Sequence, residues 1–347
     1  MAIQKIHIEE FIQNPTGVVI LDVRSPGEYQ HAHIPGAHSL PLFSDDERKV
    51  IGTTYKQNSR EEAIKIGLDF FGPKMKAMVI EAEKIVTTAE QKEKQKPSII
   101  VHCWRGGMRS AAVAWLLDLY GFEVQLIIGG YKAYRNWVIS QFEKEYTLRI
   151  IGGYTGSGKS IILRKIEKSG NTIIDLEGIA NHKGSAFGGI GMPAQPTQEM
   201  FENFLAHQLH EKNSETIWLE DESQRIGKLN IPHPLWNTIR TMPVLFIEIP
   251  FEQRLLHIVK EYGMLDKENL VNSIMRIQKR LGPLETKTAI NWLQENNITE
   301  CFRILLTYYD KTYDKALHNR ENLSTLLNRI TGEPDLKNIN ELCEKVS

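Results

Sequence analysis

The chain has few cysteines, no long apolar run and almost no net charge, and each absence excludes a class of protein. Three cysteines occur in 347 residues, Cys103, Cys301 and Cys343, and no two form a C-x-x-C pair. This spacing argues against a disulfide framework and against a zinc knuckle. No apolar run reaches the roughly 18 residues that a membrane-spanning helix requires, so we expect no membrane span.

The formal net charge is −1, so binding of nucleic acid would depend on a local basic patch rather than on bulk charge. The N-terminal residues lack the basic-then-apolar order of a secretory signal, and we therefore expect a cytoplasmic protein. With 41% hydrophobic and 24% charged residues, the length suggests two globular domains.

The chain contains two successive series of alternating strand and helix patterns, which predict α/β domains with mainly parallel sheets. We expect a first domain over 1–140, interrupted by a charged, helical insertion over 45–96 whose end, 90–96, is a solvated charge run. A boundary near 136–146 precedes a second domain over 147–347. In the first domain, strands are expected at 18–23, 98–102 and 124–128 and a helix at 110–119; in the second, strands are expected at 148–151, 171–176, 216–220 and 244–249, a helix at 159–168, and helices from 251 to the end.

The segment VHCWRGGMRS places a cysteine between a strand and a helix. The thiolate is the reactive form of cysteine, and a free thiol ionises near ~8.5. Loop N–H groups, a helix N-terminus and two nearby arginines would favour the thiolate of Cys103. A buried structural cysteine is the alternative, which the glycines and arginines disfavour. The predicted chalcogen loop comprises Trp104, Arg105, Gly106, Gly107, Met108 and Arg109 around the catalytic Cys103.

Three segments resemble rhodanese domains. Residues 21–42 contain an Asp-x-Arg pair, Asp22 and Arg24, and a His-Ile-Pro-Gly-Ala turn; CWRGGMRS resembles the active-site loop, and 129–137 the closing segment. The resemblance implies that Cys103 carries sulfur or selenium. For Asp22 and Arg24 we expect an internal ion pair that holds the loops rather than direct catalysis.

The segment GGYTGSGKS fits the phosphate-binding pattern G-x-x-x-x-G-K-[ST] between an apolar strand and a helix. Backbone N–H groups of 155–160 would cradle a diphosphate, and Lys159 would neutralise the outer phosphate. Ser160 would hold Mg²⁺ if a metal is present. A glycine-rich turn without ligand is the alternative. The predicted diphosphate-binding residues are Gly153, Thr155, Gly156, Ser157, Gly158, Lys159 and Ser160.

An acidic partner of this loop is expected at the end of a neighbouring strand. Glu220 and Asp221, with Glu222 following them, lie at the end of one such strand, and Asp175 lies at the end of another. The sequence does not choose among them. Arg254 lies where a kinase-type lid carries a phosphate-clamping arginine, but a surface helix arginine is an equal alternative.

The whole chain resembles the tRNA 2-selenouridine synthase family, in which a rhodanese domain precedes a phosphate-loop domain. Lys183 stands where the family has arginine; it keeps the charge but not the planar fork. Matching segments outside the two loops are NHKGSAFG (181–188), QPTQEMFEN (195–203), ESQRIG (222–227), YYDKTYDKAL (308–317) and IGTTYKQNSREEAIKIG (51–67).

The resemblance implies a two-step reaction on the wobble base of tRNA, a 5-substituted 2-thiouridine. Geranyl diphosphate first alkylates the sulfur, and selenophosphate from a partner enzyme then supplies selenium; no tightly bound cofactor is expected. Competing hypotheses are an ATP-dependent small-molecule kinase with an accessory sulfurtransferase domain, and a non-catalytic chalcogen relay. The residues considered for phosphate or tRNA contacts are Lys183, Arg225, Arg254, Arg276, Lys279 and Arg280.

Three of these residues, Arg276, Lys279 and Arg280, are spaced i, i+3, i+4 and so share one helix face, which either contacts RNA or is a solvated basic face. Tyr308 and Tyr309 lie among lysines, but we expect them to belong to the core.

Overall fold

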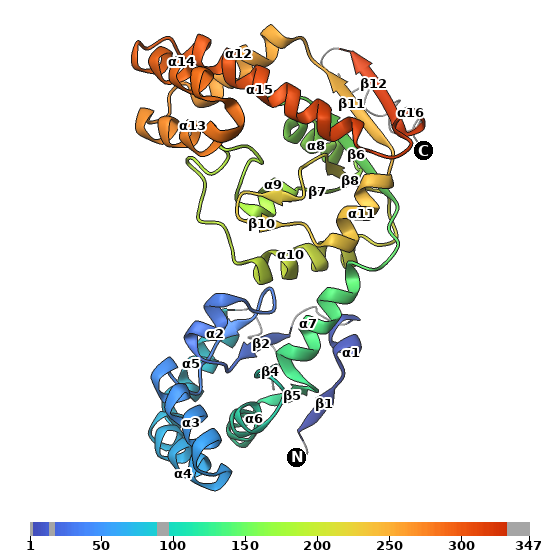
Figure 1. Ribbon diagram of the computed structural model, residues 1–347. Coiled ribbons are helices and arrows are strands. Elements are labelled where there is room, and N and C mark those ends of the chain that lie inside the picture. Colours follow the sequence, from blue (N-terminus) through green and yellow to red (C-terminus); the bar gives the residue numbers. More distant parts are fainter. Residues whose placement is uncertain (1–2, 14–17, 89–96, 332–347) are drawn as a thin grey trace. The chain divides into compact units, whose positions relative to one another are not determined.

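The computed structural model describes residues 3–13, 18–88 and 97–331 and divides the chain into two compact units, Met1–Ser140 and Gln141–Ser347. Cys343 and the predicted charge run 90–96 lie outside the described residues. Each unit contains a five-stranded parallel sheet with helices (Figure 1).

The N-terminal unit is built on a sheet with the strand order β1-β5-β4-β2-β3. All neighbouring strands pair in parallel. The strand predictions at 18–23, 98–102 and 124–128 are confirmed, whereas the two short edge strands were not predicted. The strands are β1 (Gln4–Ile6), β2 (Val19–Asp22), β3 (His38–Ser39), β4 (Ser98–His102) and β5 (Glu123–Ile127).

The predicted insertion is helical as far as the structure describes it. Ser44 begins its first helix, because its hydroxyl accepts a hydrogen bond from the Glu47 N–H while the Glu47 carboxylate accepts one from the Ser44 N–H. The helices of this unit are α1 (Ile8–Gln13), α2 (Pro26–His31), α3 (Asp45–Gln57), α4 (Arg60–Phe71), the 3₁₀ turn η1 (Gly72–Lys74), α5 (Met75–Thr88), α6 (Met108–Tyr120) and α7 (Gly130–Gln141).

Strand β4 is apolar along its length because both faces of the sheet are covered. Ile99 and Val101 pack in one cluster with Ala82 of α5 and Val113 of α6. The strand therefore ends rigidly at His102, directly before Cys103.

The C-terminal unit has the strand order β12-β11-β6-β8-β7, and all of these pairs are parallel. The strand that leads into the glycine-rich loop, β6, is central, so its carboxyl end is flanked by β8 and β11. The predicted strand 171–176 is shorter than expected because Asp175 caps a helix by accepting the Gly178 N–H. The strands are β6 (Leu148–Gly153), β7 (Thr172–Ile174), β8 (Ile217–Glu220), β9 (Arg225–Ile226), β10 (Leu229–Asn230), β11 (Val244–Glu248) and β12 (Leu327–Thr331).

The prediction that the chain is helical from 251 to the end is wrong for 327–331. These residues form β12 at the sheet edge, and the segment LNRIT lacks the apolar run that would have indicated a strand. Among the described residues, no helix is both long and apolar enough to cross a membrane. The helices of this unit are α8 (Lys159–Lys168), α9 (Leu176–Ala180), α10 (Gln198–Glu211), α11 (His233–Thr241), α12 (Phe251–Tyr262), α13 (Lys267–Leu281), α14 (Pro283–Gln294), α15 (Ile298–His318) and α16 (Leu323–Leu326).

Candidate functional site

Cys103 lies directly after β4, and its thiol is only 3% exposed. Its Sγ is 3.2 Å from the Ser110 Oγ in the first turn of α6. Burial by itself would raise the pKa of the Cys103 thiol. The hydroxyl and N–H of Ser110, together with the positive charge of Arg109, outweigh burial and lower that pKa below its usual value. The direction of this shift agrees with the sequence-based expectation for Cys103.

The backbone of the cysteine loop is held against the first turn of α7. The carbonyl oxygens of Cys103 and Trp104 accept hydrogen bonds of 2.9 Å from the N–H groups of Tyr131 and Lys132. Gly106 has a φ of 64°, and a Cβ there would lie 2.7 Å from the Ile127 carbonyl oxygen. The loop can curl in this way because Gly106 has no side chain.

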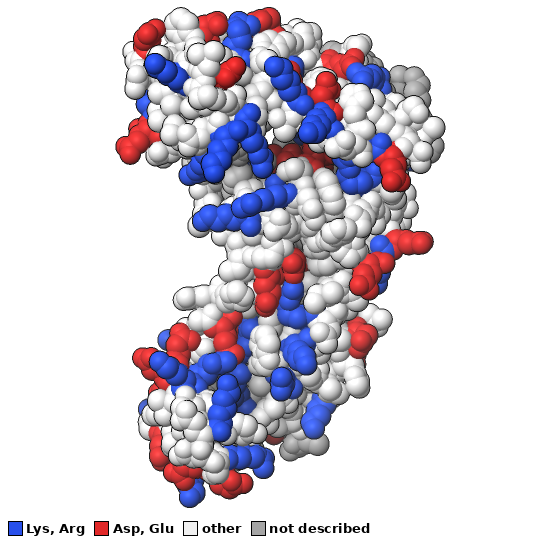
Figure 2. Space-filling model, in the orientation of Figure 1, with Lys and Arg blue, Asp and Glu red and all other residues white. Residues whose placement is uncertain are grey.

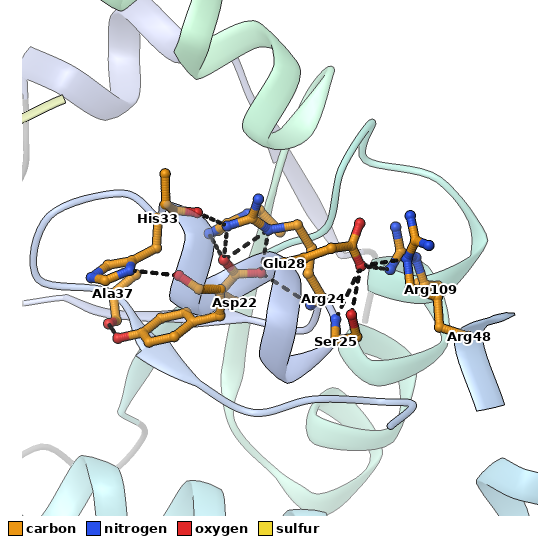
Figure 3. Close-up of polar contacts among 11 residues, drawn as sticks. Asp22, Arg24, Ser25, Glu28, His33, Ala37, Arg48 and Arg109 are labelled. Carbon is orange, nitrogen blue, oxygen red and sulfur yellow. Dashed lines mark hydrogen bonds and ion pairs between the residues drawn. The ribbon is translucent and has the colours of Figure 1, made fainter. Parts of the chain in front are cut away.

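Two arginines from different elements converge on the carboxylate of Glu28 (Figure 3). Arg109 Nη1 and Arg48 Nε each lie 2.8 Å from the same oxygen, Oε2. Burial would raise the pKa of Glu28, but the contacts with Arg109, Ser25 and Arg48 lower it to about 2. The group therefore carries one excess positive charge at neutral pH. Arg48 comes from the helical insertion, and no local pattern predicts that it reaches this loop.

Asp22 and Arg24 form the predicted internal ion pair. Arg24 Nη2 lies 2.5 Å from Asp22 Oδ2 and donates to the Ala32 carbonyl oxygen at 2.7 Å. Its guanidinium stacks 3.8 Å from the centre of the Tyr131 ring. Both charged side chains are at most 1% exposed. The pair therefore joins the loop after β2 to the start of α7 and does not face solvent. His33, beside the turn, stacks on Tyr29 with ring centres 4.0 Å apart.

The exposed side of the cysteine loop is partly apolar. Trp104 is 37% exposed and Met108 is 51% exposed. The Trp104 ring lies 5.7 Å from that of Tyr131. An apolar group could therefore rest beside Cys103.

The glycine-rich loop of the C-terminal unit turns between β6 and α8 through two glycines with positive φ. Gly156 and Gly158 have φ values of 81° and 75°, and Gly158 caps α8. Lys159 Nζ donates to the Gly153 carbonyl oxygen at 3.1 Å, and the Ser160 hydroxyl donates to Glu177 Oε2 at 2.9 Å. The Ser157 N–H donates to the Tyr154 carbonyl oxygen within the loop. The sequence instead predicts that this N–H is free to bind a phosphate.

The structure separates the acidic candidates by their partners. Glu220 is buried, and its Oε2 accepts the Leu176 N–H at 3.2 Å. Asp221 accepts from the Tyr313 hydroxyl at 2.6 Å and pairs with Arg320. Both carboxylates therefore have structural partners, and Glu220 also lies within electrostatic range of Glu177 and Glu222.

Two further carboxylates adjoin the phosphate loop, those of Glu177 and Glu222. Burial and the charge of Glu177 raise the pKa of Glu222 to about 8, and burial also raises the pKa of Glu177. Glu177 was missed in the sequence, although D-x-E after the second strand is a usable signal for it. Among the described residues, no group of three or more His, Cys, Asp or Glu side chains is arranged to hold a metal ion.

Arg254 is neither a surface residue nor directed to solvent. It is 3% exposed and forms a two-fold contact with Asp310 at 2.7 and 2.8 Å. It also donates to the Thr155 carbonyl oxygen at 3.0 Å. The surface-helix alternative is therefore wrong, and the guanidinium supports the phosphate loop from the protein side.

The remaining candidates lie on α13, on strand β9 and in the 181–188 loop. Lys183 pairs with Glu261 and lies 5.7 Å from the centre of the Tyr262 ring. Arg225 Nε donates to the Gly227 carbonyl oxygen. Arg276, Lys279 and Arg280 are all exposed on α13.

Tyr308 and Tyr309 pack against the core of the helical region, as predicted. The Tyr309 hydroxyl oxygen accepts the Ala186 N–H at 3.1 Å.

Comparison with known proteins identifies both units. Residues 8–136 match the rhodanese-like domain family, and residues 146–330 match the tRNA 2-selenouridine synthase AAA domain. A tRNA 2-selenouridine synthase of Sulfurovum sp. is 33% identical over 345 residues, which cover 89% of this chain and 91% of the relative. Those of Bdellovibrio bacteriovorus and Nitrosomonas europaea are 37% and 36% identical; the alignments cover 87% and 76% of this chain and 90% and 68% of those relatives. The family predicted from the two loops is confirmed, and the chain belongs to the tRNA 2-selenouridine synthases.

Proposed function

We propose that the protein converts the wobble 5-substituted 2-thiouridine of tRNA to 2-selenouridine, first by S-geranylation with geranyl diphosphate and then by selenium transfer from selenophosphate. The observation that carries the proposal is the presence, in one chain, of a phosphate-binding loop at Gly153–Ser160 and a thiol at Cys103 whose surroundings favour the thiolate. The Sulfurovum and Bdellovibrio relatives that bear the name of this synthase align with the chain over nearly their full length.

The first step is assigned to the C-terminal unit. The sulfur of 2-thiouridine attacks C1 of the geranyl group, the C1–O bond breaks, and diphosphate leaves. Lys159 would turn from the Gly153 carbonyl oxygen to the outer phosphate, where its charge stabilises the leaving group. Loop N–H groups at the start of α8 would hold the other phosphate oxygens. The proton of N3 leaves once the sulfur is alkylated, which keeps the base neutral.

The second step is assigned to the N-terminal unit. S-alkylation converts the sulfur into a better leaving group. The selenium of selenophosphate attacks C2 of the base, the C2–S bond breaks, and thiogeraniol leaves; water then cleaves the Se–P bond and phosphate leaves. The Cys103 thiolate would assist the hydrolysis of the Se–P bond, and the excess positive charge at Arg48 and Arg109 would attract the phosphate of selenophosphate. The exposed side chains of Trp104 and Met108 form an apolar surface against which the geranyl chain would pack.

Three further points belong to the proposal. Any Mg²⁺ that accompanies the diphosphate would bind at the Ser160 hydroxyl, which Glu177 faces. A separate enzyme would supply selenophosphate, because no described feature of the chain accounts for its synthesis. We place the protein in the cytoplasm, where its tRNA substrate is modified.

The test is mass analysis of nucleosides from 2-thiouridine tRNA incubated with the protein, geranyl diphosphate and selenophosphate. Lys159→Ala should block geranylation but still selenate tRNA that was geranylated beforehand. Cys103→Ser should geranylate and fail to selenate. Absence of both modified bases with the unaltered protein would refute the proposal, and equal loss of both steps in the Cys103 variant would refute the division of labour.

Ligand choice separates this proposal from the kinase and from the chalcogen relay. Thermal-shift measurements with geranyl diphosphate, ATP and GTP should show stabilisation by geranyl diphosphate. Stabilisation by ATP alone would favour the kinase, and stabilisation by GTP or ATP without any product would favour a nucleotide-switched relay.

A further inference from the structure

A group of exposed, unpaired basic side chains lies on the C-terminal unit. None of its five members forms an ion pair with an acidic side chain of the described residues, whereas Arg303 and Arg329 elsewhere on this unit do. Figure 2 shows Lys and Arg gathered on the side of this unit that carries α13. We call this group the basic face; it comprises Arg276, Lys279 and Arg280 of α13, and Arg225 and Lys228 of the β9–β10 hairpin.

Both parts of the basic face lie near His182. The positive charge of Arg276 is close enough to lower the pKa of this histidine, together with the larger effect of burial. On the other side, the hairpin residue Gly227 lies against the same ring, since a Cβ there would be 2.7 Å from His182 Cδ2. His182 therefore lies against the β9–β10 hairpin and within electrostatic range of Arg276 on α13.

The same loop reaches the phosphate-binding loop. A side chain at Gly184 would collide with the carboxylates of Glu222 and Glu177. Glu177 in turn accepts the hydrogen bond from Ser160. Contacts thus run from the basic face to the site where the diphosphate is expected, within one unit of the chain.

The five side chains of the basic face are not needed to bind the diphosphate. Lys159 and the N–H groups at the start of α8 serve that ligand. Lys183, which is closer to the loop carboxylates, is already paired with Glu261. In a chain with a net charge of −1, five unpaired cations on one side indicate a polyanionic partner.

We propose that the basic face binds the phosphates of the tRNA anticodon loop and presents the wobble base to the phosphate-binding loop. This inference rests on the proposed function for the identity of the RNA. Arg276 and Arg280 lie one helical turn apart, so both can contact the backbone from one side of α13. Binding releases counterions from the RNA and is therefore sensitive to salt.

The test is the affinity of the full-length protein for an anticodon stem-loop RNA that carries 2-thiouridine, measured by fluorescence anisotropy over a range of salt concentrations. Arg276→Glu/Arg280→Glu should raise Kd at least about tenfold at moderate salt and lower the slope of log K against log salt by about 1 to 2. Lys228→Glu, in the hairpin, should weaken binding in the same direction. Arg276→Lys/Arg280→Lys should retain most of the affinity because the charge is kept.

The matched control is Lys267→Glu, which makes the same charge change as Lys228→Glu and half that of the double variant; it lies in the first turn of α13, away from the face, where the lysine donates to Asn296. It should leave Kd within about twofold. Unaltered Kd and slope in the double variant, or equal weakening by Lys267→Glu, would overturn the inference. Stabilisation by geranyl diphosphate should persist in every variant, because that ligand binds at Lys159 and not at the basic face.

The two proposals can fail separately. If the unaltered protein binds the RNA through this face but produces neither modified base, the proposed function fails and the RNA-binding face stands. If it produces both bases and the charge-reversed protein binds the RNA equally well, the RNA-binding face fails and the function stands.

Discussion

The hydroxyl oxygen of Tyr313, in α15, accepts a hydrogen bond of 3.2 Å from the N–H of Gly153, the first residue of the phosphate-binding loop. The same hydroxyl donates to Asp221 Oδ2 at 2.6 Å, and Arg320 pairs with that carboxylate. A side chain 160 positions further along the chain thus holds the start of the loop. Asp221 therefore supports the start of the loop through Tyr313.

Tyr313→Phe should therefore destabilise the phosphate-binding loop, because it removes the hydroxyl while the aromatic ring stays packed in place. The change removes the partner of the Gly153 N–H and one partner of Asp221, which costs about 1–3 kcal/mol in the free energy of unfolding. Geranyl diphosphate should bind more weakly, because the loop would no longer be held in its binding conformation. Chemical denaturation and calorimetric titration measure the two effects.

The control for Tyr313→Phe is Tyr308→Phe in the same helix. The Tyr308 hydroxyl has no hydrogen-bond partner among the residues that the structure describes, so this change should leave both quantities unaltered. Equal effects of the two substitutions would show that the hydroxyl of Tyr313 has no special role at the loop.

Local sequence was sufficient to place both loops. The pattern from Gly153 to Ser160 requires a preceding strand and a following helix, and β6 and α8 begin at the predicted residues. The Asp22–Arg24 pair was also predictable, since its members are two residues apart. Residues close in the chain are constrained by the backbone that joins them.

Long-range partners and a polar edge strand were not predictable. Arg254 meets Asp310 across 56 positions, and Asp221 meets Arg320 across 99. Nothing in the neighbouring sequence indicates such pairs, so Arg254 and Asp221 were considered for ligand contacts. Strand β12 was missed because exposed edge residues need not be apolar.

Arg24→Ala should unfold much of the N-terminal unit, because it leaves the buried carboxylate of Asp22 without its charge partner. Removal of one member of a buried pair costs about 3–5 kcal/mol. Denaturation followed by near-UV circular dichroism would measure the loss. The double variant Asp22→Asn/Arg24→Met should recover part of the stability because no buried charge remains; a double variant as unstable as the single one would contradict this account.

The same pair predicts a response to acid. Burial would raise the pKa of Asp22, but His102 and Arg24 lower it below its usual 3.8. A carboxylate with a lowered pKa in the folded state stabilises the fold above its unfolded pKa, and this contribution is lost as pH falls through the folded value. The N-terminal unit should thus keep this contribution above about pH 4 and lose it only in stronger acid. Loss of the contribution near neutral pH would contradict the assignment.

Arg48→Ala should reduce the reactivity of Cys103. Glu28 would then bind Arg109 alone, so the excess positive charge next to the thiolate would disappear. We expect slower alkylation of Cys103 by iodoacetamide at neutral pH, and a KM for selenophosphate about fivefold higher, which corresponds to about 1 kcal/mol. Lys49→Ala, the next residue of α3, is the control, and geranylation should be unchanged in both. Identical kinetics of the two variants would show that Arg48 is only structural.

Glu222→Gln should abolish a pH dependence in the C-terminal unit. Burial and the charge of Glu177 raise the pKa of Glu222 from its usual 4.5 to about 8. Between these values the folded state holds more protons than the unfolded state, so stability falls as pH rises through this window. The loss should amount to a few kcal/mol, on the order of 1.4 kcal/mol for each unit of pKa shift before solvent screening.

In the Gln variant, hydrogen exchange of the β6 and β8 amides should become nearly independent of pH across this window, after correction for intrinsic exchange, and slower than in the unaltered protein above pH 8. Binding of geranyl diphosphate should tighten as pH falls in the unaltered protein, because protonation removes a negative charge next to the phosphate-binding loop, and this trend should flatten in the variant. Glu268→Gln on exposed α13 should keep the original dependence. If Glu222→Gln kept it as well, the proton would belong to another group, and Glu177→Gln would then identify or exclude the other member of the pair.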